Sequence, residues 1–553
     1  MKKLTAMLLA LLLAGSMTAC SSVGTQESSD PGSSSAVETS DVTEKRDVGG
    51  LQLPLCDETQ ELSVWTVYNN NSVPDPNDLP GIQELERRTN VHVNWIPVAT
   101  AEVQEKVGIL FSSGDFPDIV YPASYGYTGG LEKGVQDGVI ADMDTLIREN
   151  MPNYMAILNS NEQARREATS DDGKLLAVYV IVGTDTTIES EGTYMGLAYR
   201  KDLFDAMDME LPETVSGWYD VLVKAKESGM SSPFLLSANG GSNLSLAYGV
   251  TTSGMDSYLQ LDGDSVVSAA MQDGFGQYLE EMRKWYEEGL IDPNFTSGTP
   301  MTTMDFSSIE NGSTLLYDSW NAFVAGDRLY AIGNTTNPDV YMQPITNPVL
   351  QEGDQPVQSF RRVIAKDPIY ITTACEVPEL AAQWLDYWWS DEGTYLSWYG
   401  IEGESYEIGE DGTPQYTDTI LHNEEGLSPQ DALYQYAFNS GSWLGKHDIT
   451  ATWKLSDTGE EGATNIQQYA QDIWSAPETN IHITESLAFT DAEGVELSSL
   501  QTAVNTMIEE YMVNYITGNS NTSFDEFREN LKTYGVERIC EIYQSAYDRY
   551  LAR

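Results

Sequence analysis

Cysteine and histidine are scarce in this sequence of 553 residues. It has four cysteines, Cys20, Cys56, Cys375 and Cys540, and four histidines, His92, His422, His447 and His482. The cysteines are widely spaced and form no CxxC pair, so neither a disulfide framework nor a cysteine-based metal site is indicated. The histidines form no HExxH zinc motif. We therefore expect no redox chemistry, no bound metal and no cofactor.

Motifs of common enzyme classes are also absent. The sequence has no GxSxG nucleophile motif and no GxxxxGK[ST] phosphate-binding loop. With 85 acidic residues, many pairs of carboxylates would lie at glycosidase-like separations by chance. Such a pair would therefore not indicate a glycosidase. Residues 75–86 have the length of a calcium loop, but Pro80 stands where that loop requires glycine. We expect no catalytic residues, and the protein is predicted not to be an enzyme.

Basic residues are few, 29 against 85 acidic ones, which gives a formal net charge of −56. Such a charge repels polyanions, so binding to nucleic acid is not expected. Long apolar runs are lacking as well: the longest, residues 4–14, is too short to span a bilayer as a helix. Contact with a membrane would therefore require an attached lipid.

The first 20 residues have the layout of a secretory signal. Lys2 and Lys3 precede the apolar run, and small residues precede Cys20. This arrangement resembles the bacterial lipoprotein box, in which the cysteine is lipidated, although Met17 stands where leucine is commoner. We predict a signal peptide over residues 1–19, a lipidated Cys20 and a flexible Ser/Gly-rich acidic tether over residues 20–56. The alternative is an ordinary signal peptide without lipidation.

The remaining chain of about 500 residues is too long for a single hydrophobic core. After residue 60, strand-like and helix-like segments alternate, which predicts a layered α/β fold. Asn90 is predicted to end an early helix. Thr214 or Ser216 is predicted to cap a later helix that stops at Gly229. We therefore expect an α/β protein divided into lobes.

Several stretches, in this order, resemble the extracellular solute-binding proteins of ABC importers, specifically the carbohydrate-binding group that includes maltose-binding protein. They are DFPDIVYPA, GLAYRKDLF followed by LPETVSGWYDVL, WLDYWWSDEGTYLSWYGIEGESYEI, and the terminal FDEFRENLKTYGVERICEIYQSAYDRY. The resemblance implies a two-lobe periplasmic-binding-protein fold of type II, with a hinge and a central cleft. The chain would cross near residues 198–199 and 342–343 and again after residues 398–406. Lobe 1 would then comprise residues 57–198 and 342–405, and lobe 2 residues 199–341 and 406–553.

The resemblance also implies a function. The protein would be a monomer, lipid-anchored on the outer face of the cell membrane of a Gram-positive bacterium. It would capture an oligosaccharide in the interlobe cleft and deliver it to the permease subunits of an ABC transporter. The alternatives are a surface glycosidase or lyase, or the same fold binding a peptide or another small solute.

Trp320 is the leading candidate for ligand binding. It lies in the stretch LLYDSWNAF, where Asp318, Ser319 and Trp320 resemble the turn that carries a cleft tryptophan in this family. A flat aromatic ring can cover the C–H face of a sugar, and burying about 50 Å² of apolar surface contributes roughly 1 kcal/mol. Asp318 and Asn321 could supply hydrogen bonds on either side. The alternative is that Trp320 packs in the hinge.

Other candidates lie at predicted strand ends or in Gly-rich loops. They are Trp65, Asn69, Ser124, Tyr125, Tyr127, Asn239, Trp398, Tyr399 and Trp443. Each has a structural alternative: Trp65 could belong to the core, and Asn69 and Asn239 could simply shape their turns. Arg361 could form a bidentate contact with a ligand or a structural salt bridge.

Overall fold

We describe a computed structural model of the chain. It describes residues 45–553, except residues 123–125, 128, 184–194, 254–256, 298–305, 321–339, 359–363, 439–443, 449, 452–453, 456–462 and 485. Cys20 therefore lies outside the described residues. In the described part of the chain, no helix is both long enough and apolar enough to cross a membrane.

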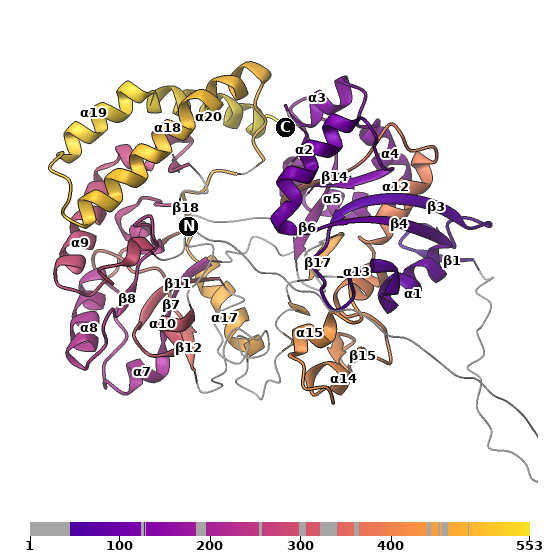
Figure 1. Cartoon of the computed structure of the whole chain (residues 1–553). Helices are drawn as coiled ribbons and strands as arrows, with labels where there is room; N and C mark the ends of the chain where they lie inside the picture. The colour runs from indigo at the N-terminus through magenta and orange to yellow at the C-terminus, as the bar shows by residue number, and fades with distance from the viewer. Residues whose placement is uncertain are drawn as a thin grey trace, which may run out of the picture. The chain divides into compact units, whose positions relative to one another are not determined.

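Lobe 1 is built around a six-stranded sheet with the order β17-β6-β14-β5-β3-β4 (Figure 1). Its strands are β3 (Gln60–Val67), β4 (Val91–Val98), β5 (Ile119–Tyr121), β6 (Val178–Gly183), β14 (Ile364–Ile371) and β17 (Lys446–Asp448). β3 pairs in parallel with β4 and β5, whereas β14 is antiparallel to β5 and β6. Strands covered on both faces carry nearly continuous apolar runs, and Ile119, Val120 and Tyr121 are all buried.

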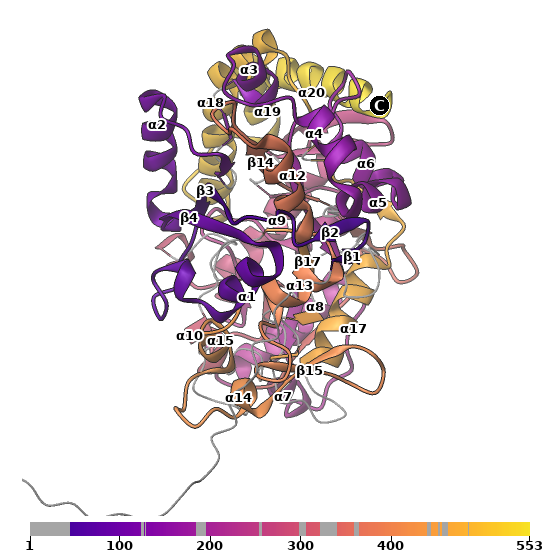
Figure 2. The same cartoon turned by 90° about the vertical axis from the view of Figure 1, so that its right-hand side faces the viewer.

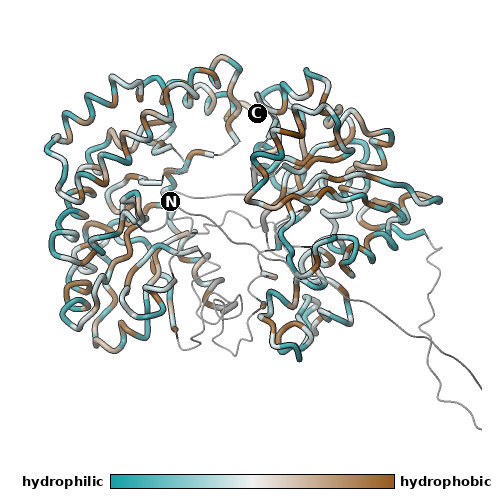
Figure 3. The backbone as a smooth tube through the Cα atoms, viewed as in Figure 1, coloured by the Kyte–Doolittle hydropathy of each residue, from teal (hydrophilic) through white to brown (hydrophobic). Residues whose placement is uncertain are grey.

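Helices accompany this sheet, and most of them bury apolar residues in the lobe 1 core. They are α1 (Pro80–Thr89), α2 (Val103–Ser113), α3 (Gly130–Gln136), α4 (Met143–Asn150), α5 (Pro152–Ser160), α6 (Glu162–Ala168) and α12 (Pro378–Tyr387). Trp384 and Trp388 are fully buried in the same hydrophobic core. Figure 3 shows hydrophobic residues along the strands and alternating character along the helices.

Lobe 2 has a separate four-stranded sheet with the order β12-β7-β11-β8. Its strands are β7 (Met195–Arg200), β8 (Phe234–Leu235), β11 (Leu316–Trp320) and β12 (Met342–Pro344). Its helices are α7 (Lys201–Asp205), α8 (Val215–Glu227), α9 (Asp273–Glu287), α10 (Phe306–Glu310), α17 (Ala463–Ser475), α18 (Asp491–Ile516), α19 (Phe524–Tyr534) and α20 (Val536–Leu551). A second core joins α8, α9 and the three C-terminal helices. Two main sheets, each with its own large core, confirm the predicted α/β fold with two lobes.

Smaller elements complete the two lobes. They are the pair β9 (Leu259–Asp262) and β10 (Ser265–Ser268), and the pair β13 (Val357–Gln358) and β18 (Thr479–Asn480). A further group consists of α13 (Asp391–Trp398), β15 (Tyr406–Ile408), β16 (Pro414–Tyr416), α14 (Asp418–Leu421) and α15 (Pro429–Leu433). This last group has its own small core, and β15, α14 and α15 lie together in both views (Figures 1 and 2).

The folded body begins earlier than the predicted tether allows. β1 (Arg46–Val48) and β2 (Leu51–Leu53) form an antiparallel hairpin whose Val48, Leu51 and Leu53 are buried in the lobe 1 core. Arg46 Nη2 also donates to Glu392 Oε2 at 2.7 Å. The predicted end of the tether at residue 56 is therefore corrected, because three apolar side chains suffice to anchor this segment.

The two sheets also divide the chain differently from the sequence-based boundaries. β7 and β12 belong to the lobe 2 sheet, although residues 195–198 and 342–344 were assigned to lobe 1. Conversely, β17 pairs in parallel with β6 of lobe 1. By sheet membership, the chain passes from one lobe to the other between β6 and β7, between β12 and β14, and between β17 and α17. The predicted crossings near residues 198–199 and 342–343 lie inside β7 and β12, and the third comes before β17, which still belongs to the lobe 1 sheet. Strand pairing between distant segments cannot be recognised from a local sequence pattern.

Candidate ligand-binding site

The end of β11 carries the polar residues around which the candidate site is built. β11 runs parallel to β8 and antiparallel to β7, and Trp320 is paired with Met195. The predicted turn at residues 318–320 is therefore wrong, because the antiparallel pairing of β11 with β7 continues to Trp320. The carboxyl ends of strands in an open α/β sheet are where ligands usually bind.

Asp318 is the most unusual side chain at this strand end. It is 8% exposed, and its Oδ1 accepts a hydrogen bond from the Asn243 backbone N–H at 2.8 Å. Burial raises the pKa of the Asp318 carboxyl to about 6, while the hydrogen bond from the Asn243 backbone N–H opposes that rise. Near pH 7 the group is mostly an ionised acceptor inside the protein.

Three buried polar atoms on β11 and on the segment that follows β8 have no hydrogen-bond partner among the described residues. They are Asp318 Oδ2, Asn243 Nδ2 and Ser237 Oγ. Ser237 lies in the loop that follows β8. Asn243 begins the 3₁₀ helix Asn243–Tyr248 that ends this loop, and its backbone N–H bonds Asp318 on β11. Because a buried polar group without a partner costs free energy, such atoms are the ones that a polar ligand can satisfy.

Asn239 lies in the same loop and helps to shape it. Its Oδ1 accepts from the Gly241 N–H at 3.0 Å, and its Nδ2 lies 3.5 Å from the Tyr258 hydroxyl. The Tyr278 hydroxyl stabilises this loop by donating to the Gly240 carbonyl at 2.9 Å. A ligand contact by Asn239 remains a prediction.

The candidates in lobe 1 mostly have partners within the protein. Trp65 is 4% exposed and belongs to the core. Asn69 is exposed, but it bonds Thr100 twice, to Oγ1 at 2.6 Å and from the backbone N–H at 2.9 Å. Tyr127 donates to Asp137 Oδ2 at 2.9 Å and packs edge-on against Phe111. These contacts hold the loops after β3 and β5 in place.

Trp398 and Tyr399 are buried in the small core around α13. Trp398 Nε1 donates to the Lys446 carbonyl at 2.9 Å, and the Tyr399 hydroxyl donates to Asp448 Oδ2 at 3.0 Å. Both partners lie on β17. The two aromatic side chains therefore attach this region to the lobe 1 sheet, and a ligand would have to displace those bonds to reach them.

Six of the sequence-based candidates cannot be placed as side chains. Asn321, Ser124, Tyr125, Arg361 and Trp443 lie outside the described residues, and for Trp320 only the backbone is described. Conversely, sequence reasoning missed Ser237, Ser242 and Asn243. The stretch SANGGSN, a polar Gly-rich run directly after a strand, carried the available signal, but only Asn239 was selected from it.

No group of three or more His, Cys, Asp or Glu side chains could hold a metal ion in the part of the chain that the structure describes. The calcium-like stretch at residues 75–86 forms the short 3₁₀ helix Pro76–Asp78 followed by α1. Asp75 caps the 3₁₀ helix by accepting from the Asn77 N–H at 3.0 Å. These residues are helical where a calcium loop would be open.

The described residues thus form two α/β lobes, with buried polar atoms that lack partners near the ends of β8 and β11. Residues 78–395 match the family model described as bacterial extracellular solute-binding protein, and the chain belongs to that family. It is an extracellular solute-binding protein of an ABC importer, as predicted.

Relatives and solved structures agree with this assignment over nearly the whole chain. The chain is 24% identical over 531 residues to the fructooligosaccharide ABC transporter substrate-binding protein FusA of Streptococcus pneumoniae, covering 91% of this chain and 93% of that protein. It is 21% identical to the polygalacturonan/rhamnogalacturonan-binding protein YtcQ of Bacillus subtilis, with 84% and 87% covered. The crystal structure of the alginate-binding protein AlgQ2 superposes with a TM-score of 0.67 at 20% identity, covering 89% of this chain and 99% of that one.

Proposed function

We propose that this protein is a lipid-anchored receptor that binds an oligosaccharide between its lobes and delivers it, unchanged, to the permease of an ABC transporter. The site around Asp318 carries the proposal. The relatives named above bind carbohydrates of several kinds, which supports a glycan as the solute. A monomer anchored through Cys20 on the outer face of a Gram-positive cell fits the secretory layout of the first 20 residues.

The chemistry of the site suits a sugar. Sugar hydroxyls are both donors and acceptors, so they can pair with the free Asp318 oxygen, the Asn243 amide and the Ser237 hydroxyl. Trp320 ends the same strand and could supply an aromatic face for the ring. A few such contacts together reach micromolar affinity, about −8 kcal/mol.

A binding screen with product analysis tests this function. The purified protein is titrated with fructooligosaccharides, oligogalacturonides and maltooligosaccharides, and melting temperature and binding heat are recorded. We expect a saturable shift with one class and recovery of the intact sugar after prolonged incubation. Cleaved products would favour the glycosidase or lyase alternative. Failure across a broad glycan panel, with binding of peptides instead, would favour the same fold with another solute.

Replacing Trp320 with alanine is expected to weaken binding of the identified sugar about tenfold, which corresponds to roughly 1.4 kcal/mol. The loss follows from removing the ring that covers the apolar face of the sugar. Isothermal titration measures it, and Trp320→Phe is the matched control because it keeps an aromatic face. Equal affinity of all three proteins would assign Trp320 to packing alone.

Replacing Cys20 with serine is expected to abolish lipid attachment and release the protein from the membrane fraction into the medium. Membrane anchorage would depend on the acyl chains, since each buried CH₂ contributes about 0.8 kcal/mol. Labelled palmitate and cell fractionation measure the change. Cys56→Ser, in the folded body, is the control and should remain anchored. A Cys20→Ser protein that stays labelled and membrane-bound would contradict the proposed anchor.

A further inference from the structure

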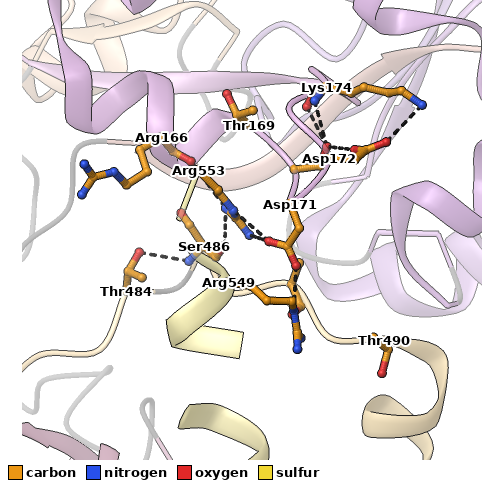
Figure 4. Close-up of polar contacts among 12 residues, drawn as sticks. Arg166, Thr169, Asp171, Asp172, Lys174, Thr484, Ser486, Thr490, Arg549 and Arg553 are labelled. Atoms are coloured by element: carbon orange, nitrogen blue, oxygen red, sulfur yellow. Dashed lines mark hydrogen bonds and ion pairs between the residues drawn. The ribbon is translucent and has the colours of Figure 1, made fainter. Parts of the chain in front are cut away.

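The turn between α6 and β6 meets the last turn of α20 and the residues beyond it (Figure 4). Asp171 Oδ1 accepts from Arg553 Nη2 at 2.7 Å and from Arg553 Nε at 2.9 Å. Asp171 Oδ2 accepts from Arg549 Nε at 2.9 Å. One carboxylate therefore pairs with two guanidinium groups.

This contact joins the two lobes. On one side, α6 contributes Ala164 and Ala168 to the lobe 1 core, and Leu175 follows the turn in the same core. On the other side, α20 contributes Ile539 and Ile542 to the lobe 2 core. The contact is separate from the three places where the chain itself passes between the lobes.

The contact is more than a loose surface ion pair. The Arg553 side chain is only 2% exposed, and that of Asp171 is 25% exposed. Arg553 Nη1 also donates to the carbonyl of Ser486 in lobe 2 at 2.9 Å and to that of Arg166 in lobe 1 at 3.4 Å. Two nitrogens of the Arg553 guanidinium donate to the same carboxylate, so the interaction is directional. Because the guanidinium is buried, salt screens this ion pair only weakly.

Neighbouring groups hold both arginines in position. Arg549 Nη2 donates to Glu493 Oε2 and to the Ala488 carbonyl, both at 2.7 Å. The centre of the Tyr550 ring lies 5.2 Å from the Arg553 guanidinium and 5.9 Å from that of Arg166. Since Arg166 belongs to lobe 1 and Tyr550 to lobe 2, this cation–π contact also crosses the interface.

We propose that Asp171, Arg549 and Arg553 form an interlobe clasp that limits how far the two lobes move apart in the ligand-free protein. Solute-binding proteins act by hinge bending, so a non-covalent contact away from the crossing segments constrains that motion. The inference concerns the protein without ligand. Its test therefore does not depend on which solute the protein binds.

The adjacent residue offers a matched control. Asp172 is the next carboxylate in the same turn, but among the described residues its partners lie within that turn, Lys174 at 3.1 Å and the Ser170 hydroxyl at 2.6 Å. Asp171→Ala removes the acceptor that both arginines share, whereas Asp172→Ala makes the same chemical change without touching lobe 2.

Single-molecule energy transfer on the full chain tests the clasp directly. Dyes are attached to ketone-bearing amino acids at the exposed positions Ser112 on α2 and Glu227 on α8. We expect Asp171→Ala to broaden the transfer-efficiency distribution of the ligand-free protein and Asp172→Ala to reproduce the original one. Arg553→Ala should broaden it as Asp171→Ala does, and combining the two should add little more. Distributions that are the same for all variants would overturn the proposal.

Hydrogen exchange can distinguish a contact that holds the two lobes together from one that stabilises only the turn containing Asp171. Loss of Asp171 should speed amide exchange across the interface, in residues 484–490 and in the last turn of α20, in a protein with unchanged circular dichroism. Faster exchange confined to residues 166–175 would mean that the ion pair stabilises only its own turn, and the proposal would fail.

Discussion

Replacing Asp318 with asparagine is expected to weaken oligosaccharide binding by about 10- to 100-fold while the protein stays folded. A hydrogen bond to a charged group contributes about 1.5–3 kcal/mol, and Asp318 Oδ2 is an acceptor with no hydrogen-bond partner among the described residues. Asparagine keeps the shape of the side chain but removes the charge and one acceptor. Isothermal titration with the sugar identified by the screen measures the loss.

Asp318→Asn is expected to weaken binding without lowering thermal stability, so a loss of binding can be distinguished from unfolding. Because burial raises the pKa of Asp318 to about 6 in the folded protein, its contribution to stability is present at low pH and lost as the pH rises through about 6. Removing the buried charge should therefore leave the melting temperature at pH 7.5 unchanged or higher. Asp220→Asn, on an exposed position of α8 in the same lobe, is the control for both measurements.

The pH dependence of binding gives a second readout of the same residue. Sugar hydroxyls donate more strongly to the ionised carboxylate, so affinity should increase as the pH rises through about 6. Asp318→Asn should abolish this dependence. A wild-type affinity that does not change between about pH 5 and pH 7.5 would place Asp318 outside the ligand contact.

Local features of the fold could be predicted from the sequence because their causes are local. Asn90 ends α1 in the left-handed conformation, with φ of 59°. Thr214 caps α8 by accepting from the Gly217 N–H at 3.1 Å, and Gly229 follows that helix with φ of 114°. Each of these depends on a residue and its neighbours within a few positions.

Long-range pairing could not be predicted in the same way. β17 lies more than 260 residues after β6, its partner in the sheet, and nothing in its short sequence identifies that partner. The site shows the same limit. The sequence indicates Asp318 only through its position beside Trp320, but its value as an acceptor depends on burial and on Asn243, which begins a distant 3₁₀ helix. Burial and missing partners are properties of the assembled fold.

Asp386 resembles Asp318 in charge and burial but has all its bonds within the protein. Its Oδ1 accepts from the Tyr154 N–H at 2.9 Å, and its Oδ2 accepts from the Asn153 N–H at 3.0 Å and the Asn153 side chain at 2.8 Å. The carboxylate thus caps the start of α5 from α12. Asn153 in turn donates to the Val48 carbonyl at 3.2 Å, so the network reaches β1.

Replacing Asp386 with alanine is therefore expected to destabilise lobe 1 by about 3 kcal/mol or more, because three buried donors lose their acceptor. Its melting temperature should fall by roughly 10 °C. Glu379→Ala, at an exposed position on α12, is the control and should change little.

Burial raises the pKa of Asp386 to about 6, so its contribution to stability is largest at low pH and decreases as the pH rises through about 6. Calorimetry should accordingly find a larger deficit at about pH 5 than at about pH 7.5, and an equal deficit at both would contradict the role of this buried carboxyl.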